Sequence, residues 1–393
     1  MTTITLKRGR EDALLRFHPW VFSGAIHKKE EKLKDGEIVR IASMSGDTLG
    51  IGHYQDGSIT VRVFAFGDQE INQDFWNGKI QNAYNSRKLI GLTDSLSTNC
   101  YRLVHAEGDG LPGLIVDIYG DTAVIQCHSI GMYRVANNIA TALQTVFGEK
   151  LNAVFNKSKE TLPRNFGLGI ENRYHFGATK SNVVLENDCK FSIDWETGQK
   201  TGFFLDQRNN RDLLAHYSKG KTVLNAFCYT GGFSVYALRA GAKRVDSVDV
   251  SEKAMELTKQ NVALNGFVEG ENHHSFAEDV MDFLKKNEKV YDVMIVDPPA
   301  FAKTLDKRHN AVQAYKRLNA MALKQVAPNG IVFTFSCSQV VDRDLFYGAI
   351  VAAAIEAGRQ VRVLHQLSQP QDHPVSLFHP EGSYLKGLIL HVE

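Results

Sequence analysis

The stretch Val223-Leu224-Asn225-Ala226-Phe227-Cys228-Tyr229-Thr230-Gly231-Gly232-Phe233-Ser234 decides the fold of the second half of the chain. An apolar strand runs into a turn that contains a glycine pair, and a helix is predicted after the turn. Glycine lets a ligand approach the backbone, and a helix N-terminus offers free N–H groups. The stretch is neither a Gly-x-Gly-x-x-Gly fingerprint nor a Walker loop. Alone, it fits a ligand site and a tight turn of a doubly wound sheet equally well.

Strands and helices alternate around this stretch. Nearly continuous apolar runs indicate strands of a parallel sheet that is covered on both faces. These strands are predicted at 222–226, 244–249, 291–297 and 330–336, with helices between them, for example at 251–265 and 310–325. The end of the chain, at 361–367 and 385–392, is predicted to add a hairpin. The pattern predicts an α/β fold with a Rossmann-like sheet.

The first half of the chain has a different texture. Short strand-like runs broken by Gly and Asp, at 36–41, 49–54 and 59–64, predict a small β-barrel. A helix at 71–92, a turn at 108–113, strands at 114–119 and 122–127 and a helix at 131–147 predict a small α+β domain. We therefore expect a barrel at 1–72, a central α+β domain at 73–185 and a Rossmann-like domain at 186–393.

Composition excludes several classes of protein. Of 393 residues, 43% are hydrophobic and 23% are charged, which is typical of globular domains. No apolar run reaches the ~18 residues of a membrane span, and the N-terminus lacks the apolar core of a signal peptide. The five cysteines are scattered without the spacing of a zinc site, so we expect free thiols, no metal and a cytoplasmic protein.

Charge is uneven although the chain carries a net charge of only +1. The first 34 residues hold eight Lys or Arg against four acids, with Phe17, Trp20 and Phe22 between them. Residues 301–324 hold six Lys or Arg against one acid. A preference for nucleic acid must come from such local patches. The alternatives are that Trp20 and Phe22 fill the barrel core and that the second patch is a solvated face.

Acids follow the predicted strands of the second half. A carboxylate at Asp249, after the second strand, is placed to accept hydrogen bonds from ribose hydroxyls. Asp279 is placed as a third ligand contact. Each acid is also suited to a helix N-cap, as is Ser251. Asp297 comes before Pro298 and Pro299, which fix the backbone at the edge where such sheets bind ligands.

One cysteine also follows a strand, in Ser336-Cys337-Ser338. A free cysteine is more often a small buried hydrophobe than a nucleophile. The end of the apolar run at Ser336 nevertheless favours a nucleophilic Cys337. Cys228 is the competing thiol, and its place in the glycine turn predicts packing beneath a cofactor.

These segments, together with Lys200-Thr201-Gly202-Phe203-Phe204-Leu205-Asp206-Gln207-Arg208, resemble class I S-adenosylmethionine-dependent methyltransferases. Nearly the whole chain is similar to the ribosomal RNA large subunit methyltransferase I family, which makes 5-methylcytosine in 23S rRNA. That family has an N-terminal PUA-type RNA-binding barrel, a central α+β domain and a C-terminal methyltransferase domain. The resemblance also implies a homodimer.

The resemblance implies a role for each motif. Cys337 would be the nucleophile, and Asp297 would line the target-base pocket and contact the base, next to the cofactor. The other expected contacts to S-adenosylmethionine are Phe204, Asp206, Gln207, Arg208, Asn225, Phe227, Tyr229, Thr230, Gly231, Gly232, Asp249, Ser251 and Asp279. The expected contacts to RNA are Pro298, Pro299, Phe301, Lys7, Arg8, Arg10 and Trp20.

The sequence is also compatible with other functions. Asp297-Pro298-Pro299-Ala300-Phe301 resembles the motif of nucleic-acid nitrogen methyltransferases, which need no thiol. A non-catalytic RNA-binding ribosome-assembly factor is a further alternative, although nothing in the motifs looks degraded. The missing dinucleotide fingerprint disfavours a dehydrogenase. Some RNA cytosine methyltransferases carry a second cysteine after the fourth strand, and this motif has none, which leaves the base that releases the product unassigned.

Overall fold

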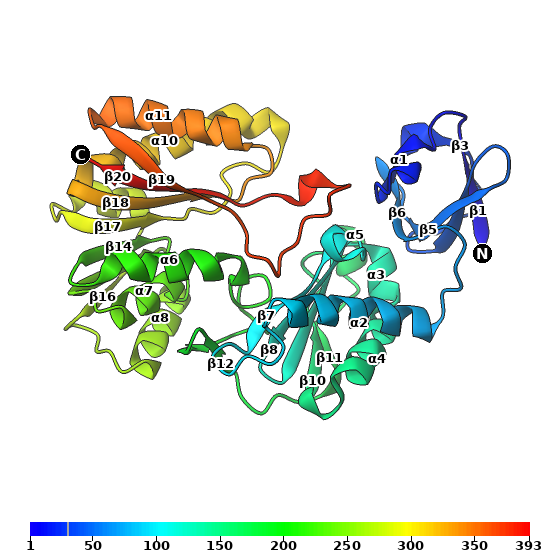
Figure 1. The fold of residues 1–393 in the computed structure, drawn as a ribbon, viewed down its shortest axis with the longest axis horizontal. Coiled ribbons are helices and arrows are strands. Elements are labelled where there is room, and N and C mark those ends of the chain that lie inside the picture. The colour runs from blue at the N-terminus through cyan, green and yellow to red at the C-terminus, as the bar shows by residue number, and fades with distance from the viewer. Residues whose placement is uncertain (30) are drawn as a thin grey trace. The chain divides into compact units, whose positions relative to one another are not determined.

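The computed structural model describes residues 1–29 and 31–393, which form two compact units (Figure 1). The first unit comprises Met1–Val184, Ile193–Leu205 and Gln371–Gly382, and the second comprises Leu185–Ser192, Asp206–Pro370 and Ser383–Glu393. The division at 1–72, 73–185 and 186–393 stays a prediction. Two segments of the expected third domain, Ile193–Leu205 and Gln371–Gly382, pack with the first unit.

A six-stranded sheet in the order β2-β6-β5-β4-β1-β3 opens the first unit. Its strands are β1 (Thr2–Leu6), β2 (Trp20–Phe22), β3 (Ile26–Lys28), β4 (Ile38–Ala42), β5 (Thr48–Tyr54) and β6 (Ile59–Phe66), with the short helix α1 (Asp12–Leu15). Ile4, Val39 and Val61 are fully buried in its core. The three strands predicted here are β4, β5 and β6.

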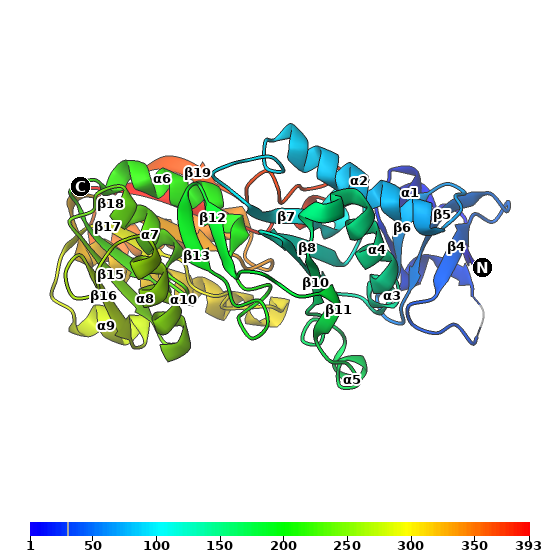
Figure 2. The same ribbon diagram turned by 90° about the horizontal axis from the view of Figure 1, so that it is seen from below.

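A second sheet of the first unit has the order β11-β10-β9-β8-β7. Its strands are β7 (Cys100–His105), β8 (Leu114–Tyr119), β9 (Thr122–Cys127), β10 (Ala153–Asn156) and β11 (Arg173–Gly177). Helices α2 (Gln73–Leu89) and α4 (Ala136–Phe147) pack side by side against it (Figure 2). The helix predicted at 131–147 is interrupted: α3 (Ile130–Arg134) ends where Val135 leaves helical geometry.

Two smaller features complete this part of the chain. The short helix α5 (Arg164–Gly167) lies between β10 and β11 in the sequence, and β12 (Val183–Glu186) pairs with β13 (Cys189–Ser192).

The second unit is built on a seven-stranded sheet in the order β16-β15-β14-β17-β18-β20-β19. Its strands are β14 (Thr222–Ala226), β15 (Arg244–Asp249), β16 (His273–Ala277), β17 (Tyr291–Val296), β18 (Val326–Ser336), β19 (Val361–Leu367) and β20 (Lys386–Val392). All neighbours are parallel except β20, which is antiparallel to both β18 and β19. The expected pairing of the last two strands is confirmed.

Helices cover both faces of this sheet (Figure 1). Helices α6 (Arg208–Ser218), α7 (Gly232–Arg239) and α8 (Glu252–Leu264) lie on one face. Helices α9 (Val280–Lys286), α10 (Arg308–Gln325) and α11 (Arg343–Ala357) lie on the other. Two-sided burial explains the nearly continuous apolar runs of β14 and β17.

The strand order determines where a ligand site forms. The chain leaves β14 toward β15 on one side and later returns to its other side as β17. The carboxyl ends of these parallel strands therefore open at one edge, beside the point where the order reverses, which is where doubly wound sheets bind ligands. Among the residues that the structure describes, no helix has the length and apolar content needed to cross a membrane.

Candidate cofactor and target-base site

The loop after β14 holds a strained backbone. Phe227 and Tyr229 have positive φ angles of 60° and 48°, and Gly231 has a φ of 77°. A non-glycine residue in this region costs on the order of 1–3 kcal/mol and is concentrated at functional sites. At Gly231 a Cβ atom would lie 2.7 Å from Thr258 Cγ2, so only glycine fits between the loop and α8. The predicted glycine turn is therefore present. The positive φ angles at Phe227 and Tyr229 were not expected from the sequence.

Polar atoms of this loop lack partners. Asn225 Oδ1 and Thr230 Oγ1 are buried and have no hydrogen-bond partner among residues 1–29 and 31–393. A buried polar atom left unpaired costs about 1–3 kcal/mol, and such atoms in native proteins usually have a reason. Both atoms lie at the carboxyl end of β14, so this edge has the unpaired polar groups expected of a site for a polar ligand.

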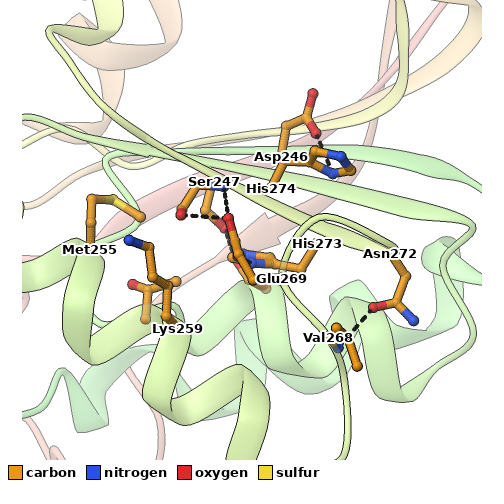
Figure 3. Close-up of polar contacts among 12 residues, drawn as sticks. Asp246, Ser247, Met255, Lys259, Val268, Glu269, Asn272, His273 and His274 are labelled. Atoms are coloured by element: carbon orange, nitrogen blue, oxygen red, sulfur yellow. Dashed lines mark hydrogen bonds and ion pairs between the residues drawn. The ribbon is translucent and has the colours of Figure 1, made fainter.

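A chain of hydrogen bonds fixes the Asn225 amide. Asn225 Nδ2 donates to Ser234 Oγ at 2.8 Å, and Ser234 Oγ lies 2.7 Å from Ser247 Oγ. Ser247 Oγ lies 2.7 Å from His273 Nε2, and His273 Nδ1 lies 2.5 Å from Glu269 Oε2 (Figure 3). The Asn225 amide nitrogen can only donate and the Glu269 carboxylate can only accept, so every donor points the same way. Burial lowers the pKa of His273, which favours the neutral ring, whose Nε2 can accept from Ser247. The chain holds Asn225 Oδ1 in one orientation.

The Asp249 carboxylate ties the second strand to this loop. Its oxygens accept the Tyr229 N–H and the Ser251 N–H, each at 3.0 Å. A carboxylate has about four acceptor positions, so further donors can bind it. Ser251 is the N-cap of α8 and accepts from the Ala254 N–H at 3.2 Å. The alternative of a capping role is thus confirmed for Ser251.

Asp279 also occupies a cap. It is the N-cap of α9 and accepts the Met281 N–H at 2.8 Å and the Asp282 N–H at 3.1 Å. Its side chain is exposed and follows β16 at the same sheet edge. The capping alternative is confirmed, and its expected contact with a ligand stays a prediction.

The segment before α6 brings Gln207 to Asp297. Gln207 Nε2 donates to Asp297 Oδ2 at 2.9 Å, and Asn210 Nδ2 holds Gln207 Oε1 at 2.6 Å. Asp206 accepts the Tyr384 hydroxyl at 2.6 Å, and Asp206 and Arg208 are buried. These residues belong to the second unit. Phe204 belongs to the first unit, where Lys200 Nζ lies 4.4 Å from the centre of its ring.

The Asp-Pro-Pro segment continues from β17. Asp297 is half-buried, Pro298 is buried and Pro299 is exposed. Phe301 is exposed by 36% and packs on Tyr315 of α10, with ring centres 4.8 Å apart. A partly exposed aromatic ring therefore follows Asp297 by four residues.

The cysteines differ in exposure. Cys337 is half-buried directly after β18, whereas Cys100, Cys127, Cys189 and Cys228 are buried. Cys228 Sγ lies 3.7 Å from Met255 Sδ, and burial, followed by the charge of Asp249, raises the pKa of Cys228 well above its usual value. The structure thus agrees with a packing role for Cys228.

The expected RNA-binding residues of the first unit lie on its surface. Lys7, Arg8 and Arg10 are exposed. Trp20 is half-buried, with its Nε1 donating to Glu107 Oε1 at 2.9 Å, and Phe22 is 48% exposed. The alternative that Trp20 and Phe22 fill the barrel core is wrong, because Val21 points into that core and its two neighbours on the strand point away.

The second basic patch is mostly exposed. Lys316 pairs with Glu356 at 2.9 Å. The other basic side chains of this patch are all exposed, namely Lys303, Lys307, Arg308, Arg317 and Lys324. The segment that directly follows Asp297-Pro298-Pro299 in the chain therefore exposes positive charge.

His18, His379 and Glu381 bring one ligand atom each within 4.8 Å of the others. His18 Nδ1 accepts the Trp20 N–H at 3.2 Å, so the proton of the neutral ring sits on Nε2, which faces Glu381. A metal-binding histidine instead donates from its other nitrogen. This arrangement does not present three ligands to a metal.

Comparison with known proteins defines the class. A family model described as S-adenosylmethionine-dependent methyltransferase matches residues 177–379, and a PUA-like domain model matches residues 4–66. With the sheet order and the glycine loop, these matches make the chain an S-adenosylmethionine-dependent methyltransferase with an N-terminal PUA-like domain.

Relatives that match nearly the whole chain identify the family. Ribosomal RNA large subunit methyltransferase I of Aeromonas hydrophila is 39% identical over 397 residues, which covers 99% of this chain and 98% of the relative. The protein of that name from Tolumonas auensis is 39% identical, with 99% of both chains covered. The chain belongs to the ribosomal RNA large subunit methyltransferase I family. A solved S-adenosylmethionine-dependent methyltransferase of Streptococcus mutans shares the fold, with a TM-score of 0.84, 24% identity and full coverage of both chains.

Proposed function

We propose that this methyltransferase forms 5-methylcytosine in 23S rRNA through a covalent adduct between Cys337 and carbon 6 of the target cytosine. The observation that carries the proposal is the position of Cys337, a half-buried thiol at the carboxyl edge of the sheet that also carries Asp297. The names of the full-length relatives support ribosomal RNA as the substrate.

The residues of the loop after β14 fit S-adenosylmethionine. Asn225 Oδ1 and Thr230 Oγ1 are buried acceptors that the described residues leave unpaired. Asp249 keeps acceptor positions for ribose hydroxyls, and Gly231 leaves no side chain in the way. Asp206, Gln207 and Arg208 would close over the group, and Phe227, Tyr229, Gly232, Ser251 and Asp279 are proposed to complete the contacts.

The chemistry of methylation at carbon 5 explains why the reaction needs a thiol. Carbon 5 of cytosine is a poor nucleophile. When bound, S-adenosylmethionine supplies an electrophilic methyl group. Attack of the Cys337 thiolate forms a sulfur–carbon 6 bond and moves the electrons of the ring double bond to carbon 5. Carbon 5 would then take the methyl group as the methyl–sulfonium bond breaks and its electron pair stays on the departing cofactor sulfur. A base removes the proton from carbon 5, the double bond re-forms, and the sulfur–carbon bond breaks to return the thiolate.

Asp297 is proposed to contact N3 of the cytosine. Its Oδ2 accepts a hydrogen bond from Gln207 Nε2 at 2.9 Å, which orients the carboxylate at the end of β17. Pro298 fixes the backbone after Asp297, and the exposed face of Phe301 is available for stacking on the base. The target nucleotide must be unpaired or flipped out, at a cost of a few kcal/mol.

The first unit is proposed to bind the RNA. Phe17 and Phe22 are 50% and 48% exposed, and Lys7, Arg8 and Arg10 are exposed in the segment that joins β1 to α1. Aromatic rings stack on unpaired bases, and basic side chains neutralise phosphates. The expected homodimer stays a prediction that sedimentation analysis tests.

The decisive experiment identifies the product. The protein is incubated with labelled S-adenosylmethionine and unmodified 23S rRNA, and the nucleosides are analysed by mass spectrometry. We expect 5-methylcytosine from the natural protein, none from Cys337→Ala, and normal product from Cys189→Ala, which removes a buried thiol of the same unit. A nitrogen-methylated base that Cys337→Ala still forms would favour the nitrogen methyltransferase. Label transfer that fails despite cofactor binding would contradict the proposed activity.

A further inference from the structure

A buried lysine reaches the turn that holds Cys337. Lys386 is the first residue of β20, is 6% exposed and pairs with Ser336 in the β18–β20 ladder. Its Nζ donates to the carbonyl oxygens of Ser338 and Tyr384, each at 2.7 Å. Lys386 is therefore bound to the residues on both sides of Cys337, through backbone pairing at Ser336 and through its side chain at Ser338.

This ammonium lacks a close counter-ion. Among the residues that the structure describes, no carboxylate lies within 4.0 Å of Lys386 Nζ. Two of its three N–H groups go to neutral carbonyls, and a buried charge without a partner is costly. The third N–H is left for an anionic partner.

Several charged and titratable groups surround Lys386 and Cys337. Burial lowers the pKa of Lys386 to about 8, and interaction with Cys337 acts in the opposite direction. At the start of α11, Arg343 disfavours the ammonium and Asp342 favours it. From α10, the buried Tyr315 hydroxyl interacts with both Cys337 and Asp297. Of these groups, only Lys386 and Arg343 are cations.

We propose that Lys386 is a positioning residue whose ammonium is the counter-ion of the Cys337 thiolate. In the uncharged pair, the Cys337 S–H bond breaks and its proton forms the third N–H bond of the Lys386 amine, while the electron pair stays on sulfur. The pair remains neutral overall, now as thiolate and ammonium. The thiolate that returns after product release meets the same ammonium. The role of this pair in catalysis rests on the proposed function.

Alkylation tests the pair without substrate. The natural protein is treated with iodoacetamide over a range of pH, and modified cysteines are identified by peptide mass spectrometry. We expect Cys337 to react at a lower pH than free cysteine does, because the thiolate is the reactive form. Lys386→Met should slow alkylation near neutral pH by about tenfold, equal to a displacement of the profile by about one pH unit. Lys386→Arg, which keeps the charge, should restore part of the rate.

Methylation separates this role from a structural one. We expect Lys386→Met to lower kcat several-fold near neutral pH, to leave the KM for RNA unchanged and to recover activity as the pH rises. The control Lys285→Met removes an exposed lysine that pairs with Asp282, and it should behave like the natural protein. A loss that is equal at every pH would make Lys386 a purely structural residue.

The outcomes distinguish the two proposals. If Cys337 of the natural protein shows the profile of an ordinary thiol, the inference is overturned whether or not the variants fold. If product formation depends on Cys337 but Lys386→Met alkylates and methylates normally, only the inference fails. If no 5-methylcytosine forms while Cys337 alkylates as expected, the proposed function fails and the thiolate–ammonium pair stands.

Discussion

Replacing Gly231 by alanine should damage the cofactor loop in a measurable way. The new Cβ would lie 2.7 Å from Thr258 Cγ2 and 3.2 Å from its Oγ1. Thr258 cannot yield easily, because it is fully buried and its hydroxyl lies 2.8 Å from Tyr229 O and 3.0 Å from Ala254 O, which share its one proton. The substitution also places a side chain on a backbone with a φ of 77°.

The magnitude follows from two contributions. A side chain in the left-handed region costs about 1–2 kcal/mol. Overpacking a well-packed site adds about 1–3 kcal/mol. Gly220 supplies a matched control, since its φ is 71° and a Cβ there meets no atom within 4 Å. Gly220→Ala should therefore show only the backbone cost, and Gly231→Ala should exceed it by about 1–3 kcal/mol.

The assay must report on the second unit. All three tryptophans, Trp20, Trp76 and Trp195, lie in the first unit, so their fluorescence does not follow the loop. Hydrogen exchange of peptides from β14 and α8 measures the opening free energy directly. Calorimetry should show weaker S-adenosylmethionine binding by Gly231→Ala and unchanged binding by Gly220→Ala. Equal destabilisation by the two variants would refute the steric argument.

Three other perturbations are informative. Glu186→Gln removes the carboxylate that lies 2.7 Å from the buried Arg211 guanidinium. It should lower the stability of the second unit, measured by hydrogen exchange, by about 3–5 kcal/mol. Recovery of stability in the double variant with Arg211→Met would support the buried-charge explanation. Ser247→Ala should cost about 1–3 kcal/mol by interrupting the chain from Asn225 to Glu269, whereas Ser218→Ala, which removes only a bond to a helix carbonyl, should cost less. Burial lowers the pKa of His53 from 6.5 to about 3, so its contribution to stability is complete above pH 6.5 and is lost as the pH falls toward 3; NMR at about pH 5 should find a neutral ring, and titration near 6.5 would contradict this.

The sequence predicted the centre of the second unit best. β14 and β15 have the predicted bounds, because strands covered on both faces must be continuously apolar. The edge strand β16, with the sequence His273-His274-Ser275-Phe276-Ala277, was missed because an edge strand tolerates polar side chains. Alternation did not reveal the break at Val135 either, since apolar spacing is the same on both sides of it.

The candidate site was predictable only in part. Strand ends of a parallel sheet meet at one edge, so the positions of Asp249, Asp297 and Cys337 follow from periodicity and topology. Lys386 does not follow, because its place beside Cys337 depends on the antiparallel register of β18 and β20, which no local pattern encodes. A lysine at the start of an otherwise apolar strand was the one signal that marked it.

Charge and burial favour Cys337 over Cys228 as the nucleophile. Both thiols follow strands at the same edge, and composition alone does not separate them. Cys228 is buried, and Asp249 adds negative charge that disfavours its thiolate. Cys337 is half-buried, and in the proposed pair the Lys386 ammonium would favour its thiolate. Because the thiolate is the reactive form, the cation beside β18 and the carboxylate beside β14 should make these two cysteines chemically unlike.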